Sequence, residues 1–443
     1  MFRTRLCGLA LLAWPAVCSL AAEPLVGDPS HAPAEAVSAS GADALTLADA
    51  LAKVLRENPA LQAASYTLRA QEARRDQAAL KPAWNATLEA ENFLGSGRLH
   101  GVESLETTLR LGTVIERGGK RERRIDEADS ERALLQVEQD VERLDLLAEA
   151  TRRFIHVAAD QEGLALTRRA TTLAARSSEL VEQRVRAAKA GDAESGKARI
   201  AVARAGIAEE HAEHELRSAH VALAALWNAR EPGFARAQAD FFDLPTPESL
   251  DALVAALDRN PTVLRFATEQ RVEEARLALA RSNRRSDWTL NAGVRRFEAL
   301  DDQALVLSVS VPFGSAARAA PFEREAGHRI EATAAKESAT RADLYRTLFA
   351  SYQELLHAQT QADTLRARVI PEAERVLKHT EDGYAVGRYS YLDLVDAQQQ
   401  LLIVQREAVE AARDYHLLFV ELERLAGRAI GVAASALETA HDR

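Results

Sequence analysis

The chain has 443 residues and a formal net charge of −10, and it combines 47% hydrophobic residues with only 5% aromatic residues and one methionine. The acidic balance argues against a nucleic-acid partner. Abundant Ala, Leu, Arg and Glu with few aromatic residues are typical of long helices packed through small side chains, not of a compact globular core.

Residues 1–22 have the pattern of a secretory signal peptide. Arg3 and Arg5 give the basic start, an apolar core follows, and small residues precede an expected cut after Ala21 or Ala22. The apolar core is too short to span a bilayer as a helix. We therefore expect the mature chain to leave the cytoplasm.

Both cysteines of the chain, Cys7 and Cys18, lie inside this signal, so we expect a mature chain with no thiol and no disulfide. Lipid attachment at Cys18 would require a small residue before it, and Val17 does not meet that requirement. No stretch resembles a transmembrane helix, so any contact with a membrane is expected to be made by strands.

Residues 23–44, rich in Pro, Ala and Ser, are expected to form a flexible leader. Thr46 can cap a helix that runs to about Lys81. Pro59, which follows Asn58, should kink this helix or start a new segment, because proline has no backbone N–H to donate.

After this helix the hydrophobic pattern changes from a helical period to a period of two. Two strands are predicted within residues 84–116 and two within 287–313, each with one apolar and one polar face. Such strands match an outer-membrane barrel, and Trp84 and Trp288 near the strand starts suit the membrane interface. The alternative is two soluble hairpins packed on the helices. In a barrel, the polar face would place these charged residues in the lumen: Glu89, Glu91, Glu106, Arg110 and Arg295.

Four strands cannot close a barrel, and lipid does not tolerate open sheet edges. If the strands lie in a membrane, the chain must therefore oligomerise. A dimer would supply eight strands, whose pore its own side chains would fill, whereas a trimer would supply twelve and leave room for a lumen. This argument favours a homotrimer.

From about Lys120 to Ala190 the pattern is again helical, and apolar residues step by three and four as in a heptad seam. The seam residues of this half are Val141, Leu144, Ala148, Thr151, Ile155 and Ala158. The second half repeats the rhythm at Leu344, Leu348, Ser351, Leu355, Ala358, Ala362, Leu365 and Val369. At 1.5 Å per residue, a helix of about seventy residues reaches roughly 100 Å, so it must project beyond a bilayer into an aqueous space.

Each half contains a helical hairpin whose turn carries a glycine, Gly191 in the first half and Gly387 in the second. The Asn-Pro pair at 58–59 recurs at 260–261, at nearly the same spacing as the two glycines. Two landmarks in register predict a duplicated architecture. The alternative is that each glycine merely separates two helices.

These landmarks divide the chain into six expected segments. They are a signal peptide at 1–22, a leader at 23–44, a first repeat at 45–230, an inter-repeat segment at 231–249 packed around the outside of the helices, a second repeat at 250–427 and a C-terminal tail at 428–443.

The segment at 384–398, with the sequence Tyr-Ala-Val-Gly-Arg-Tyr-Ser-Tyr-Leu-Asp-Leu-Val-Asp-Ala-Gln, resembles the TolC family of outer-membrane efflux channels. The resemblance extends over nearly the whole mature chain, from about Leu45 to Gly427. The Gly-Gly-Lys-Arg element at 118–121 resembles the CzcC-like heavy-metal branch of this family, although Arg117 stands where that branch has leucine.

The resemblance implies a mainly helical fold with membrane strands. Three protomers, with four strands each, would form a twelve-stranded β-barrel in the outer membrane of a Gram-negative bacterium, continuous with a long-helix α-barrel in the periplasm. Such a channel is a passive duct without cofactors, and a periplasmic adaptor and an inner-membrane RND-type pump supply energy and substrate. The CzcC-like element favours heavy-metal cations as the cargo.

The resemblance also places the contacts with the adaptor at the helical tips. The tip residues carried over in this way are Val386, Gly387 and Arg388 in the second repeat, with Ala190 and Gly191 in the first. The first tip lacks the aromatic residues and the Leu-Asp pair of the second, so its match to the family pattern is less complete.

Asp393 and Asp396 lie three residues apart just after the second tip, on one face of the predicted helix. In TolC-like channels this position lines the periplasmic aperture, where threefold symmetry would gather six carboxylates that attract cations and repel anions. The alternative is a solvated acidic face at a helix start, which the helix dipole favours by itself.

His211, His214 and Glu215, with His220 nearby, have a spacing that suits a two-point metal site. Two ligands do not make a closed site, and histidine is common on solvated helices. A channel should also conduct its substrate rather than retain it. We therefore predict no metal site.

The sequence also gives no support for an enzyme: it has no phosphate-binding glycine loop, no cysteine nucleophile after the signal and no nucleophile-elbow serine. Three alternatives to a heavy-metal channel stay open. One is a multidrug or type I secretion channel. The second is a periplasmic adaptor (membrane fusion protein), which would show one helical hairpin instead of two, and the third is a structural coiled coil, which would lack the strands.

Overall fold

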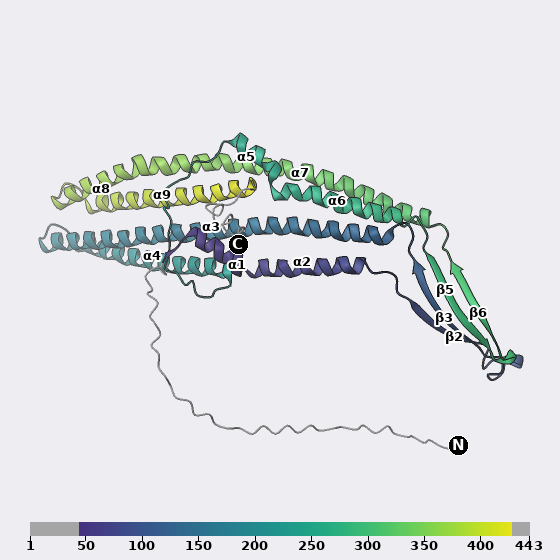
Figure 1. Cartoon of the computed structure of the whole chain (residues 1–443). Coiled ribbons are helices and arrows are strands. Elements are labelled where there is room, and N and C mark those ends of the chain that lie inside the picture. The colour runs from purple at the N-terminus through teal and green to yellow at the C-terminus, as the bar shows by residue number, and fades with distance from the viewer. Residues whose placement is uncertain (1–43, 428–443) are drawn as a thin grey trace, which may run out of the picture. The chain divides into compact units, whose positions relative to one another are not determined.

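The computed structural model describes residues 44–427 (Figure 1). The expected signal peptide with both cysteines, nearly all of the leader, and the C-terminal tail lie outside these described residues. The helices are α1 Leu47–Glu57, α2 Pro59–Ala78, α3 Lys120–Arg186, α4 Asp192–Ala224, α5 Leu250–Ala256, α6 Pro261–Ser282, α7 Ser315–Thr364, α8 Ile370–Ala385 and α9 Tyr391–Leu425. The strands are β1 Ala44–Leu45, β2 Asn85–Glu91, β3 Glu106–Ile115, β4 Arg236–Ala237, β5 Trp288–Phe297 and β6 Asp302–Ser310.

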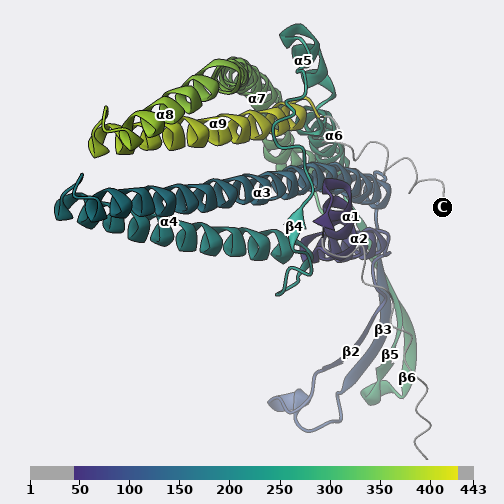
Figure 2. The same ribbon diagram turned by 90° about the vertical axis from the view of Figure 1, so that its left-hand side faces the viewer.

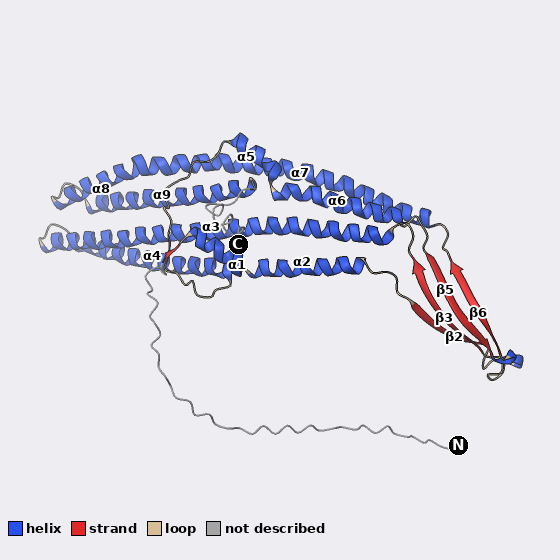
Figure 3. Cartoon of the chain, viewed as in Figure 1, coloured by secondary structure: helices blue, strands red, loops and turns tan. Residues whose placement is uncertain are grey.

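The fold is mainly helical with one small antiparallel sheet, as the periodicity predicts (Figure 3). The sheet has the order β2-β3-β5-β6, and every neighbouring pair is antiparallel. The predicted strands are therefore present, and the two hairpins meet through β3 and β5 along the register from Glu106 opposite Phe297 to Ile115 opposite Trp288. The sheet leaves the helices at one end, and the tips of both helical hairpins lie at the other end (Figures 1 and 2).

The two Asn-Pro pairs make equivalent hydrogen bonds in the two halves of the chain. Asn58 accepts a hydrogen bond from the backbone N–H of Ala60 at 2.8 Å and donates through its amide to the carbonyl of Leu226 at 2.7 Å. Asn260 accepts from the N–H of Thr262 at 2.7 Å and donates to the carbonyl of Leu425 at 2.7 Å. Each asparagine thus caps the helix that its proline starts and fixes it to the end of another helix.

The heptad seams form much of the helical core. Ala148, Thr151, Ile155 and Ala158 are buried in the first half, and Leu348, Leu355, Ala358 and Ala362 are buried in the second. The inter-repeat segment adds Phe234 and Phe241 to the first core. In the described part of the chain, no helix has a stretch long and apolar enough to cross a membrane.

Two local features differ from the sequence prediction. Residue 44, which the sequence assigns to the leader, belongs to β1, because β1 pairs in parallel with β4 of the inter-repeat segment. The helical pattern that precedes the second tip is interrupted by a π-helical segment at Leu365–Val369, between α7 and α8. Pro371, two residues after this segment, has no N–H to continue the regular helical hydrogen bonds, which explains the irregularity.

The Gly-Gly-Lys-Arg element makes the turn from β3 into α3. Gly118 and Gly119 both have a positive φ, of 83° and 70°, and a Cβ on Gly118 would lie 2.8 Å from the carbonyl oxygen of Ser282. Lys120 is buried and its Nζ lies 2.8 Å from the carboxylate of Asp287, at the start of β5. The element therefore joins the two halves of the chain where helices and sheet meet.

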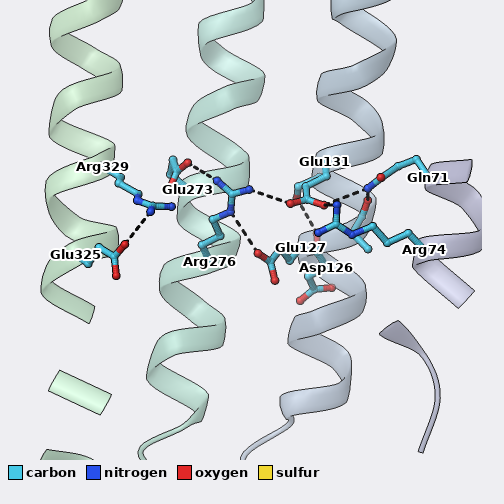
Figure 4. A network of polar contacts seen from close by, with 11 residues as sticks. Gln71, Arg74, Asp126, Glu127, Glu131, Glu273, Arg276, Glu325 and Arg329 are labelled. Carbon is cyan, nitrogen blue, oxygen red and sulfur yellow. Dashed lines mark hydrogen bonds and ion pairs between the residues drawn. The ribbon is translucent and has the colours of Figure 1, made fainter. Parts of the chain in front are cut away.

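A polar network joins α2, α3 and α6 near this junction (Figure 4). Arg276 of α6 contacts Glu127 at 3.3 Å and Glu131 at 2.9 Å, both on α3, and Glu273 of its own helix at 2.7 Å. Gln71 of α2 also donates to Glu131, at 3.1 Å. One guanidinium thus contacts three carboxylates and links the two halves of the chain.

Candidate functional site

The five charged residues that the sequence assigns to a barrel lumen come together on one face of the sheet. Arg295 of β5 donates to Glu106 of β3 at 2.9 Å and to Glu91 of β2 at 3.0 Å. Arg110 forms an ion pair with Glu89. These pairs connect β2, β3 and β5, so the cluster spans three of the four strands.

The strand register explains this cluster. Glu91 lies directly opposite Glu106, and Thr108 lies directly opposite Arg295. Two like charges in opposite positions repel, and a guanidinium within reach of both removes that repulsion. Thr108 is completely buried and accepts a hydrogen bond from Nε of Arg295 at 2.8 Å. The alternation places Thr108 on this polar face, but only the register shows that it positions Arg295.

The opposite face of the sheet is apolar and exposed. Leu88 of β2 is 71% exposed, and Leu305 and Leu307 of β6 are 88% and 77% exposed. The same face carries further exposed apolar residues at Leu109, Leu111, Ile115, Val294 and Val309. A continuous exposed apolar surface marks a contact with a membrane or another protein. The outer edges of β2 and β6 pair with no other strand of the described chain.

At the second tip, α8 and α9 are separated by a turn in which Gly387 has a φ of 80°. Val386, Gly387 and Arg388 are all exposed. A Cβ at Gly383 would lie 2.1 Å from the ring of Tyr389, so only glycine fits that position. At the first tip Gly191 is exposed and Ala190 is half-buried. The predicted tip residues therefore form the ends of the two hairpins.

The two tips are joined by a cluster that sequence reasoning missed. Arg184 of α3 donates to the carbonyl of Tyr384, and its guanidinium lies 4.4 Å from the centre of the tyrosine ring. Tyr384 is 1% exposed, and its hydroxyl donates to Glu194 of α4 at 3.1 Å. Burial, and then the hydrogen bond to Glu194, raise the pKa of Tyr384 to about 12, so the phenol stays protonated. The only sign of this cluster in the sequence is the aromatic residue Tyr384, three positions before Gly387.

Asp393 forms a capping box with Ser390 at the start of α9. Its carboxylate accepts from the N–H of Ser390 at 2.8 Å and from the hydroxyl at 2.7 Å, while its own N–H donates to that hydroxyl at 3.2 Å. These hydrogen bonds lower the pKa of Asp393 below its ordinary value. The helix-start role that the sequence analysis weighed as an alternative is thus present, and a place in an aperture does not conflict with it.

Asp393 and Asp396 are both exposed and line one open groove between α8 and α9, with a volume of about 1260 Å³. Basic residues share this groove, among them Arg375 and Lys378. The single protomer therefore places both aspartates on one accessible face.

The histidines of α4 do not converge on one point. His211 pairs with Glu215 at 3.2 Å and His214 pairs with Glu210 at 3.9 Å. His220 packs instead against Phe234, with the ring centres 4.9 Å apart. Between residues 44 and 427 no group of three or more His, Cys, Asp or Glu side chains is arranged to hold a metal ion.

No protein-family model matches the chain. The chain is 28% identical over 328 residues to the cobalt-zinc-cadmium resistance protein CzcC of Cupriavidus metallidurans. The aligned region covers 73% of this chain and 77% of CzcC. Its fold matches a crystal structure of CusC with a TM-score of 0.72 and 14% identity, over 86% of this chain and 92% of CusC. It also matches the outer membrane protein VceC of Vibrio cholerae with a TM-score of 0.68 and 18% identity, over 87% and 97% of the two chains. The chain therefore has the fold of these outer-membrane channel structures, and its sequence is similar to that of CzcC.

Proposed function

We propose that the chain is one protomer of a homotrimeric outer-membrane channel that serves as the exit duct of a tripartite efflux system. The observation that carries this proposal is the four-stranded sheet, with a charged face, an exposed apolar face and two unpaired edges. The helices would stand in the periplasm of a Gram-negative bacterium and the sheet would lie in its outer membrane.

The sheet supports a closed barrel on physical grounds. In lipid every backbone N–H and C=O needs a partner, so the edges of β2 and β6 must pair. Pairing β6 of one copy with β2 of the next keeps the apolar face outward and the charged face inward. Three copies give twelve strands and a lumen, whereas two copies give eight strands and a pore that side chains fill.

The helical part supports a passive conduit. α3 has 67 residues, so at about 1.5 Å per residue it is roughly 100 Å long, several times the thickness of a bilayer core. Energy and substrate would come from an inner-membrane RND-type pump through a periplasmic adaptor. The exposed residues Val386, Gly387 and Arg388, with Ala190 and Gly191, would meet that adaptor at the hairpin tips.

For the cargo we propose heavy-metal cations, with drugs or secreted proteins as the alternative. CzcC, to which the chain is similar, is named for resistance to cobalt, zinc and cadmium. The exposed pair Asp393 and Asp396 would give six carboxylates around a threefold axis, a field that favours cations over anions.

Two experiments test this proposal. The full chain, extracted from membranes in a mild detergent, should run on an unheated gel as an oligomer that heating converts to a monomer, and it should form channels in a planar bilayer. A water-soluble monomer would contradict the membrane assignment. Growth of a strain lacking the gene, on zinc, cobalt and cadmium salts compared with dyes and detergents, separates metal efflux from drug efflux.

A further inference from the structure

A groove of about 330 Å³ lies where the sheet joins the helices. At this junction α6 is followed by β5, and β6 is followed by α7 (Figure 1). Its lining residues are Lys120, Asn283, Ser286, Asp287, Pro312, Ser315, Arg318, Ala319 and Phe322. The functions proposed above make no use of this groove.

The groove offers hydrogen-bond donors for an anion. Arg318 is exposed, and its guanidinium has no hydrogen-bond or ion-pair partner among residues 44–427, so all of its donors are available. Lys120 uses one donor on Asp287, at 2.8 Å, and retains two. The hydroxyl of Ser286 donates to the carbonyl of Pro312 at 2.6 Å and lies 2.7 Å from that of Ser315. The serines therefore shape the wall, and the two cations supply the donors.

The surroundings of the groove are strongly basic although the whole chain carries a net charge of −10. Residues 79–84, 115–126, 281–288 and 311–324 form this junction band. Its basic residues are Lys81, Arg117, Lys120, Arg121, Arg123, Arg124, Arg281, Arg284, Arg285, Arg318 and Arg324. Its acidic residues are fewer: Glu116, Glu122, Asp126, Asp287 and Glu323. The junction band therefore carries a net positive charge although the chain as a whole is acidic.

Exposed aromatic side chains lie at the same level. Trp84 is 73% exposed, Phe322 is 63% exposed and Phe313 is 93% exposed. Arg117 lies over the ring of Trp288 at 4.6 Å. Aromatic rings beside basic residues at the end of an apolar sheet face are typical of a membrane–water interface, where rings sit among headgroups and cations meet phosphates.

We propose that this groove binds the headgroup phosphate of an acidic phospholipid, of the phosphatidylglycerol class, from the leaflet on the helical side of the membrane. Arg318 and Lys120 contact the phosphate, and the acyl chains run along the apolar face of the sheet beyond Phe313. Charge complementarity selects an acidic lipid over a zwitterionic one, because the band is positive and an acidic headgroup has no cation of its own. This inference rests on the proposed membrane placement of the sheet.

The test uses the full chain in a neutral detergent, with dioctanoyl phosphatidylglycerol or dioctanoyl phosphatidylcholine added and binding followed by native mass spectrometry. Phosphatidylglycerol should bind more tightly than phosphatidylcholine, and its affinity should fall as the salt concentration rises. Arg318→Gln combined with Arg285→Gln should weaken its binding by about 25-fold, because each basic residue near an acidic lipid surface contributes about fivefold. The matched control is Arg199→Gln with Arg204→Gln, two exposed arginines of α4 far from the junction, which should leave the affinity unchanged.

Equal affinity for the two lipids, or an equal loss in both double variants, overturns the inference. So does displacement of phosphatidylglycerol by inorganic phosphate at equal concentration, because the site would then recognise a free anion. Insertion into vesicles of pure phosphatidylcholine is measured separately. A chain that fails to insert into them contradicts the proposed function itself, whereas insertion without lipid preference contradicts only the headgroup site.

Discussion

Arg295→Gln should destabilise the sheet, because it removes the charge that lies between two facing glutamates. Glu91 and Glu106 occupy directly opposite positions in the register of β2 and β3. In the native sheet, Arg295 donates to both, at 3.0 and 2.9 Å, and to Thr108 at 2.8 Å. Glutamine is shorter and neutral, so the two carboxylates would face each other without a cation.

The size of the effect follows from the exposure of the partners. Breaking a buried ion pair costs about 3–5 kcal/mol, whereas an exposed pair contributes about 0–1 kcal/mol. The side chains of Arg295 and Glu106 are 27% and 22% exposed, and that of Glu91 is 43% exposed. The cluster lies between the two limits, so we expect a loss of about 2 kcal/mol per protomer.

The assay is the temperature at which the detergent-solubilised oligomer dissociates, with unfolding of the sheet followed by circular dichroism. Arg296→Gln is the matched control, because Arg296 is the next residue and pairs only with exposed Glu298 and Asp301. It should leave the dissociation temperature of the oligomer nearly unchanged, because exposed ion pairs contribute little to stability. Adding Glu91→Gln to Arg295→Gln should restore part of the loss, since one of the two repelling charges is then gone. Equal effects of Arg295→Gln and Arg296→Gln, or no recovery in the double variant, would refute the reasoning.

Four further predictions concern the tips and the helix starts. Tyr384→Phe removes the hydroxyl that donates to Glu194, and it should lower the protection of the tip helices against hydrogen exchange by about 1 kcal/mol; unchanged protection would mean that this hydrogen bond contributes nothing. Asp393→Asn with Asp396→Asn keeps a capping side chain but removes the charges, so it should weaken block of the channel by divalent cations in planar bilayers; identical block in both channels would exclude the aspartate ring. Because the folded pKa of Asp393 lies below its ordinary 3.8, its contribution to stability is present above that pH and is lost as the pH falls through the lowered pKa, which titration of the Asn variant against wild type can check. Asn58→Ala should cost about 1–2 kcal/mol in denaturant unfolding, and an unaltered midpoint would contradict its capping role.

The sequence predicts the elements because each has a periodicity of its own. A period of two between 84 and 116 and between 287 and 313 reveals the strands, and steps of three and four reveal the long helices. The π-helical segment at Leu365–Val369 could not be predicted, because a proline inside a helical pattern signals a disturbance without specifying its form. The start of β1 was missed because a strand of two residues has no periodicity to detect.

The contacts of the candidate site depend on residues far apart in the chain, and this is why the sequence reveals them only in part. Alternation places Glu91, Glu106 and Arg295 on one face, but their contacts require the pairing of β3 with β5 across nearly two hundred residues. Arg184 and Tyr384 belong to different hairpins, and nothing in the local pattern of either residue indicates the other. A single sequence carries periodicity, whereas register and the docking of hairpins are properties of the folded chain.

Within a single copy, the helical part buries its apolar residues and pairs its polar groups more completely than the sheet does. The helical part already buries its seams, caps helices with Asn58 and Asn260, and links α6 to α3 through the ion pairs of Arg276. The sheet buries little of its apolar face, with Leu305 88% exposed, and leaves two edges unpaired in the described chain. An exposed apolar face and open edges favour association with other surfaces, because both are stabilised once they are covered or paired. The helical part is therefore largely satisfied within one chain, whereas in the proposed channel the sheet would be stabilised by neighbouring copies and lipid.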